Sequence, residues 1–70
     1  MSVRWLYNAE GEVALYQDGE YLYSPNGGQC LYRQSGTWFY EMKGGDAAFY
    51  VNGKWLHAAK DGKAVFQYEG

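Results

Sequence analysis

The sequence has few of the residues that cross-link small domains. It contains one cysteine, Cys30, and one histidine, His57, in 70 residues. A lone cysteine cannot form an internal disulfide and is typical of a reducing compartment. A lone histidine, without cysteine or carboxylate groups at ligand spacing, does not make a metal site. We therefore expect no metal and no other cofactor.

Strong charge of one sign and long apolar runs are also missing. Six basic and eight acidic residues are dispersed along the chain, for a net charge of −2. Without a basic stripe, nucleic acid is not an expected partner. No segment has the length and apolar character of a membrane span, and the start of the chain has no apolar run of signal-peptide length. These absences predict a cytoplasmic domain that binds neither nucleic acid nor membrane.

Aromatic residues, by contrast, make up 20% of the chain. Each ring can bury about 150–250 Å², so the aromatics must supply much of the core. A chain of this length buries only about 60% of its unfolded surface, so we expect the fold to close on itself or to pair with another copy. No window shows the 3.6-residue period of an amphipathic helix, which leaves an all-β fold.

The aromatics recur in a triplet found four times. The triplets are Trp5-Leu6-Tyr7, Tyr21-Leu22-Tyr23, Trp38-Phe39-Tyr40 and Trp55-Leu56-His57. Seven positions after the end of each triplet comes a small residue, at eight an apolar residue, and at nine an aromatic. These columns are Ala14, Cys30, Ala47 and Ala64; Leu15, Leu31, Ala48 and Val65; and Tyr16, Tyr32, Phe49 and Phe66. Each copy reads as two short strands joined by turn residues.

We therefore predict one domain, 1–70, built from β-hairpin repeats at 5–20, 21–37, 38–54 and 55–70. The first and last copies resemble the inner ones, so the repeats should close into a pseudo-fourfold ring or small barrel, which also removes unpaired strand edges. In this ring Phe66 should lie beside Trp5.

The turns predict the strand register. Asp18-Gly19 suits a two-residue hairpin loop, whereas 34–36 and 51–53 suit three-residue loops that end in a glycine with positive φ. The resulting cross-strand pairs are Tyr16 with Tyr21, Tyr32 with Trp38, and Phe49 with Trp55.

Strand alternation then divides the residues between two faces. The predicted inner face carries Leu6, Leu15, Leu22, Leu31, Phe39, Ala48, Leu56 and Val65. The predicted outer face carries Trp5, Tyr7, Tyr16, Tyr21, Tyr23, Tyr32, Trp38, Tyr40, Phe49, Trp55 and Phe66. Because the predicted outer face is so rich in aromatic residues, we expect it to be either covered by neighbouring hairpins or turned toward a partner.

The four-copy pattern of aromatic-apolar-aromatic triplet, glycine, and small-apolar-aromatic columns resembles the four-fold β-flower proteins, small bacterial domains of four similar β-hairpins. That resemblance implies a fold and a bacterial origin, and no activity. The segments Gly36-Thr37-Trp38-Phe39-Tyr40 and Gly53-Lys54-Trp55-Leu56-His57 are also similar to the hairpins of choline-binding cell-wall repeats, which implies a small-ligand role.

The aromatic face is the feature of the sequence most suited to binding, and we expect no catalysis. The candidate binding residues are Trp5, Tyr21, Trp38, Trp55 and His57. One hypothesis is a module that binds a protein partner or a second copy, because Trp and Tyr are enriched at interface hot spots. Another is a domain that stacks its rings on a carbohydrate or a choline-type cation. A remote alternative is an enzyme centred on His57. Cys30, in an alanine column, reads as an apolar filler.

Overall fold

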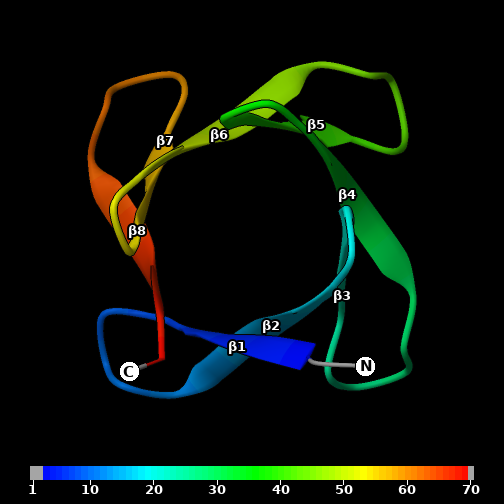
Figure 1. The fold of residues 1–70 in the computed structure, drawn as a ribbon, viewed down its shortest axis with the longest axis vertical. Coiled ribbons are helices and arrows are strands. Elements are labelled where there is room, and N and C mark those ends of the chain that lie inside the picture. Colours follow the sequence, from blue (N-terminus) through cyan, green and yellow to red (C-terminus); the bar gives the residue numbers. More distant parts are fainter. Residues whose placement is uncertain (1–2, 70) are drawn as a thin grey trace.

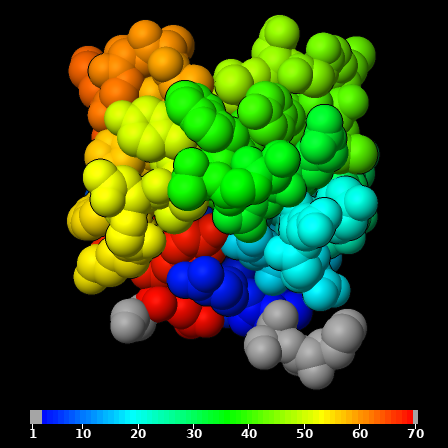
Figure 2. All heavy atoms as spheres, turned by 45° about the horizontal axis from the view of Figure 1, so that its top comes forward, coloured from blue at the N-terminus to red at the C-terminus, as the bar shows by residue number. Residues whose placement is uncertain are grey.

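The computed structural model describes residues 3–69, which form eight antiparallel strands in one closed barrel. In chain order the strands are β1 (Val3–Tyr7), β2 (Val13–Asp18), β3 (Tyr21–Tyr23), β4 (Cys30–Ser35), β5 (Trp38–Glu41), β6 (Ala47–Asn52), β7 (Trp55–Ala58) and β8 (Ala64–Tyr68). Each strand pairs with its neighbours in sequence, and β8 pairs with β1 to close the ring (Figure 1). The space-filling view also shows the first and last strands, in blue and red, side by side (Figure 2). The predicted all-β ring of four hairpins is confirmed.

Three tight turns connect β2 to β3, β4 to β5 and β6 to β7. Each is a two-residue turn that begins with glycine, at Gly19, Gly36 and Gly53, whose φ angles are 65°, 65° and 63°. The second turn residue has negative φ in every case, which is the pattern of a type II′ hairpin turn. The prediction of positive φ at Gly36 and Gly53 is confirmed, but the predicted three-residue loops are wrong.

The predicted cross-strand pairs are wrong for the same reason. Tyr16 lies opposite Tyr23 and not opposite Tyr21, which faces Asp18. The partners of Trp38 and Trp55 across the tight turns are likewise Ser35 and Asn52, in place of Tyr32 and Phe49.

The difference in repeat length lies instead in the wide turns. Five residues, 8–12, separate the paired residues Tyr7 and Val13, whereas six residues, 24–29, separate Tyr23 and Cys30. The first copy is therefore offset by one position. The structural equivalents of Tyr16 are Arg33, Tyr50 and Gln67, and the residue equivalent to Tyr32, Phe49 and Phe66 is Leu15.

A β-bulge in each hairpin joins the register of the wide turn to that of the tight turns, in which the aromatic column lies on the inside. The register shifts directly after Leu6, Leu22, Phe39 and Leu56. The extra residue interrupts the strict alternation of faces. Tyr32, Phe49 and Phe66, predicted on the outer face, therefore pack against the core, and the ring of Phe49 lies 5.0 Å from that of Tyr32 and 5.3 Å from that of Phe66.

The ring closes through a different pair from the one predicted. Phe66 lies opposite Leu56, and the residue opposite Leu6 in the closing strand is Tyr68. Trp5 contacts Tyr16, with ring centroids 5.4 Å apart, so the predicted contact between Phe66 and Trp5 is wrong.

The register places the interior side chains in three layers of four. The middle layer, fully buried, is Leu6, Leu22, Phe39 and Leu56. The layer toward the tight turns is Gln17, Gln34, Val51 and Tyr68. The layer toward the wide turns is Leu15, Tyr32, Phe49 and Phe66. Burial of the predicted core residues Leu6, Leu15, Leu22, Phe39 and Leu56 is confirmed, whereas Leu31, Ala48 and Val65 are only half-buried extra residues of the bulges.

The layer near the tight turns is partly polar and fully hydrogen-bonded. Tyr68 donates its hydroxyl hydrogen to Gln17 Oε1 at 2.5 Å, and Gln17 Nε2 donates to Gln34 Oε1 at 2.7 Å. The Arg4 guanidinium lies 3.7 Å from the centre of the Tyr68 ring. Burial raises the pKa of Tyr68, an effect that Arg4 opposes, so the phenol keeps the proton that it donates. Every buried side-chain N or O atom in residues 3–69 has a hydrogen-bond partner.

Replacing Gly53 with alanine tests the tight turns. A Cβ at Gly53 would have no atom within 4 Å, so the cost comes from the backbone alone. We expect Gly53→Ala to lower the free energy of unfolding by about 1–2 kcal/mol, measured by urea denaturation. The control Lys54→Ala, at the next residue with negative φ, should change it by less than about 0.5 kcal/mol. Equal stability of the two variants would contradict the turn assignment.

Removing Gln17 tests the polar layer. We expect Gln17→Leu to lower the free energy of unfolding by about 1–3 kcal/mol, because the buried Tyr68 hydroxyl loses its acceptor. The double change Gln17→Leu with Tyr68→Phe should cost less than the sum of the single changes. Gln29→Leu, an exposed glutamine, is the control. Additive costs would show that the two side chains do not interact.

Candidate functional site: the outer aromatic rows

The outer surface carries four rows of three side chains, each row crossing three strands. The first row is Trp5, Tyr16 and Tyr23; the second is Tyr21, Arg33 and Tyr40; the third is Trp38, Tyr50 and His57; and the fourth is Trp55, Gln67 and Tyr7. Members of a row are directly opposed cross-strand partners, the arrangement in which side chains on one face of a sheet contact each other. Each row joins two hairpins.

In the first and third rows a tyrosine ring lies between two other rings. Tyr16 lies 5.4 Å from Trp5 and 5.2 Å from Tyr23, and the Tyr23 ring is stacked on it at 22°. Tyr50 lies 5.3 Å from Trp38 and 5.1 Å from His57, which is stacked at 14°. The two rows therefore repeat one geometry, with tryptophan tilted on one side and a flat ring stacked on the other.

The second and fourth rows replace the central tyrosine. In the second row the Arg33 guanidinium lies 5.4 Å from the centre of the Tyr40 ring, which is a cation–π contact. In the fourth row the central residue is Gln67, which has neither a ring nor a charge. The four outer sides of the barrel thus differ chiefly in their central side chain.

The first member of every row is an exposed aromatic residue. Trp5 is 37% exposed, Tyr21 40%, and Trp38 and Trp55 are each 41% exposed. These are four of the five predicted binding residues, and the closed barrel places them in four different rows. They therefore do not converge on one site. His57, the fifth, shares a row with Trp38 and lies across Tyr50 from it.

His57 and Cys30 both have structural partners. His57 Nδ1 lies 3.0 Å from the carbonyl oxygen of Gly62, in the adjoining wide turn. The Cys30 thiol is half-buried and lies 3.8 Å from the carbonyl oxygen of Tyr32.

Within residues 3–69, no three His, Cys, Asp or Glu side chains are grouped so that they could hold a metal ion. The same residues include no helix long and apolar enough to cross a membrane.

Burial also raises the pKa of two tyrosines near these rows. For Tyr23 the further causes include the neighbouring Cys30 and Asp18, and for Tyr32 the further cause is Glu41. Both phenols therefore keep their protons to a higher pH than an unperturbed tyrosine does.

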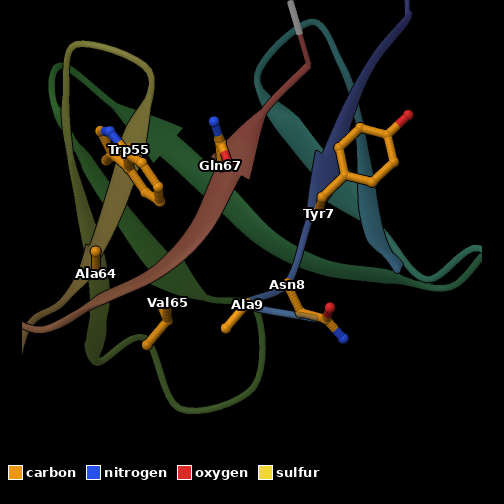
Figure 3. Close-up of a pocket in the computed structure, with 7 residues that line it drawn as sticks. All are labelled: Tyr7, Asn8, Ala9, Trp55, Ala64, Val65 and Gln67. Atoms are coloured by element: carbon orange, nitrogen blue, oxygen red, sulfur yellow. The ribbon is translucent and has the colours of Figure 1, made fainter. Parts of the chain in front are cut away.

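A cleft of about 190 Å³ opens in the fourth row. It is lined by Tyr7, Asn8, Ala9, Trp55, Ala64, Val65 and Gln67. Figure 3 shows Gln67 between Trp55 and Tyr7, with Ala9 and Val65 along the other side of the cleft. The cleft lies where the first and third rows carry the tyrosine ring.

A larger and more open cleft, of about 380 Å³, lies at the wide-turn end of the barrel. Its lining includes Tyr32, Phe49 and Phe66 from the end layer, the small residues Ala47, Ala48, Ala58 and Val65, and the charged residues Glu41 and Lys60. Small side chains at the bulges leave the aromatic end layer partly open there.

The middle residues of the rows were missed by sequence reasoning. Tyr16 was aligned with Tyr32, when its equivalents are Arg33, Tyr50 and Gln67. The usable signal was the wide turn of the first copy, which is one residue shorter than the others. If the one-residue gap in the alignment of the four copies is placed in that turn, the fourth residues of β2, β4, β6 and β8 align with one another. These residues are the centres of the four rows.

No protein-family model, curated protein or solved structure matches this chain. The resemblance to the four-fold β-flower proteins and to the choline-binding repeats therefore stays a prediction.

Removing a central ring tests the rows. We expect Tyr50→Ala to lower the free energy of unfolding by about 1–3 kcal/mol, because it removes two aromatic pairs worth about 0.5–1.5 kcal/mol each. The matched control is Gln67→Ala at the equivalent position, where no ring pair is lost, with an expected change below about 0.5 kcal/mol. Urea denaturation followed by circular dichroism measures both. Equal losses would contradict a contribution from ring stacking.

Proposed function

We propose that this chain is a non-catalytic binding module whose outer aromatic rows contact a protein partner. The observation that carries the proposal is the equivalent, exposed aromatic residue at the start of all four rows. Trp and Tyr dominate the energetics of protein interfaces, and Arg33 in the second row is of the third type enriched there. The rows offer such residues on every side of the barrel.

The rows are also well prepared for binding. A tryptophan that packs against a neighbouring ring loses little side-chain freedom when a partner covers it. Rigid aromatic contacts of this kind keep the entropic cost of association low. Trp5 and Trp38 are held in this way by Tyr16 and Tyr50. The partner is another protein or a second copy of the chain, and light scattering of the purified chain distinguishes the two.

We propose that the module works in a reducing compartment such as the bacterial cytoplasm, a setting that suits its free Cys30. The four-hairpin ring supports membership of the four-fold β-flower family, which we propose on the sequence pattern.

A second candidate function is small-ligand binding of a carbohydrate or choline type, and the two aromatic-lined clefts favour it.

Substitution of the exposed tryptophans tests the proposed function. The purified chain is immobilised and proteins retained from a lysate of the source organism are quantified. We expect Trp5→Ala and Trp38→Ala each to reduce retention of a specific partner by about tenfold or more, since a hot-spot residue contributes at least about 2 kcal/mol. Met42→Ala, which removes an exposed apolar side chain outside the rows, is the control.

Circular dichroism first confirms that each variant is folded. Equal retention by wild type and tryptophan variants would contradict a role of the rows in protein binding. A change of tryptophan fluorescence on addition of choline or oligosaccharides, together with no retained partner, would favour the second candidate.

A further inference from the structure

We propose that the cleft of the fourth row is a binding site for a phenol ring, which it holds between Trp55 and Tyr7. This inference rests on the proposed function and names the chemistry that one row recognises. The ring belongs either to a tyrosine side chain of a partner or to a free phenol. The inference follows from comparing the central positions of the four rows, which are equivalent within one molecule.

The first and third rows show what such a position accommodates. In both, a tyrosine ring lies between a tilted tryptophan and a flat ring, at centroid distances between 5.1 and 5.4 Å. The fourth row keeps the two flanking residues, Trp55 and Tyr7, and replaces the central tyrosine with Gln67. The flanking pair is thus present and the ring between them is missing.

The glycine of the adjoining wide turn shows that the space is left open. A Cβ built at Gly28 would lie 3.7 Å from the Tyr16 hydroxyl, and one at Gly62 would lie 3.5 Å from the Tyr50 hydroxyl. In the first and third rows, the hydroxyl of the central tyrosine therefore reaches this glycine. At the equivalent Gly11 of the fourth row, as at Gly45 of the second, no atom outside the glycine and its two chain neighbours comes within 4 Å of that point.

The size and lining of the cleft fit one ring. Its volume is about 190 Å³, and an apolar cavity of about 150 Å³ is enough to hold benzene. The walls are the rings of Trp55 and Tyr7 and the small apolar side chains Ala9, Ala64 and Val65. The Gln67 amide offers both a donor and an acceptor, and a phenol hydroxyl can use either.

Asn8, the other polar residue of the cleft, is already engaged. Its Oδ1 accepts hydrogen bonds from the backbone N–H groups of Glu10 and Glu12, at 3.0 and 2.9 Å. Gln67 is therefore the side chain that gives the cleft its polar specificity, and the aromatic pair gives it its shape.

The test is a titration of the full chain with p-cresol, followed by ¹H–¹⁵N NMR. A ligand this small should bind with a Kd of about 1 mM. We expect shifts centred on the Trp55 indole N–H and the Gln67 side-chain amide. Trp55→Ala should weaken binding about tenfold. Gln67→Tyr should abolish it, because the new ring fills the cleft as Tyr16 fills the first row.

Two further arms sharpen the result. Tyr50→Gln should create a second p-cresol site between Trp38 and His57. Non-specific binding of p-cresol to apolar surface would not produce this second site. 4-Methylcyclohexanol, of similar size but without a π system, should bind at least several-fold more weakly. N-acetyl-tyrosinamide binding more tightly than p-cresol would assign the ring to a protein partner, and the reverse order to a free phenol.

The proposal is overturned if p-cresol causes no shifts at Trp55 and Gln67, or if Gln67→Tyr binds as well as wild type. Should Gln67→Tyr fail to fold, unchanged binding by Trp55→Ala overturns it instead. Met42→Ala is again the control. Failure here is distinct from failure of the proposed function, because the retention experiment uses Trp5 and Trp38, which lie in other rows.

Discussion

The β-bulge after each middle-layer residue is the constraint on which the rest of the structure depends. Counted from the wide turns, strict alternation would put Tyr32, Phe49 and Phe66 on the outer face; counted from the tight turns it puts them inside, and the bulge joins the two registers. With the bulge, these rings keep the inward direction set by the tight turns and close the wide-turn end of the core. The regular register on the tight-turn side of the bulge makes Tyr16, Arg33, Tyr50 and Gln67 the central outer residues. One local irregularity, used four times, therefore lets the register of the inner rings and outer rows continue into the strand pairing at the wide turns.

The outer rows also explain how a nearly fourfold molecule has distinct sides. Tilted tryptophan and stacked ring recur in the first and third rows, a guanidinium takes the central place in the second, and an amide takes it in the fourth. Because each row joins neighbouring hairpins, a ring in the central place both stabilises the barrel and fills the surface. In the fourth row, where an amide takes the place of the ring, that stabilisation is given up and a cleft remains. Binding specificity in such a fold arises from the places where its copies differ.

The amino-acid sequence was sufficient for the architecture and not for the register. Four triplets, the glycine turns and the absence of a helical period predicted a closed ring of hairpins, and the fully buried Leu6, Leu22, Phe39 and Leu56 were correctly placed. The bulges could not be predicted, because the extra residues, such as Leu31 and Val65, are apolar and look like ordinary core positions. The one-residue deletion in the first wide turn was assigned to the tight turns, since Asp18-Gly19 is itself a favoured hairpin sequence. Both errors moved the rings to the wrong face, and the cleft at Gln67 was missed with them.

The most direct test of this account is the set of ring-to-ring nuclear Overhauser effects of Phe66 in the free protein. The bulged register predicts strong effects between Phe66 and both Phe49 and the methyl groups of Leu56, and none between Phe66 and Trp5. The register predicted from the sequence alone would bring Phe66 to the outer face beside Trp5. Effects between those two rings, with none to Phe49, would contradict the bulges and the outer rows built on them.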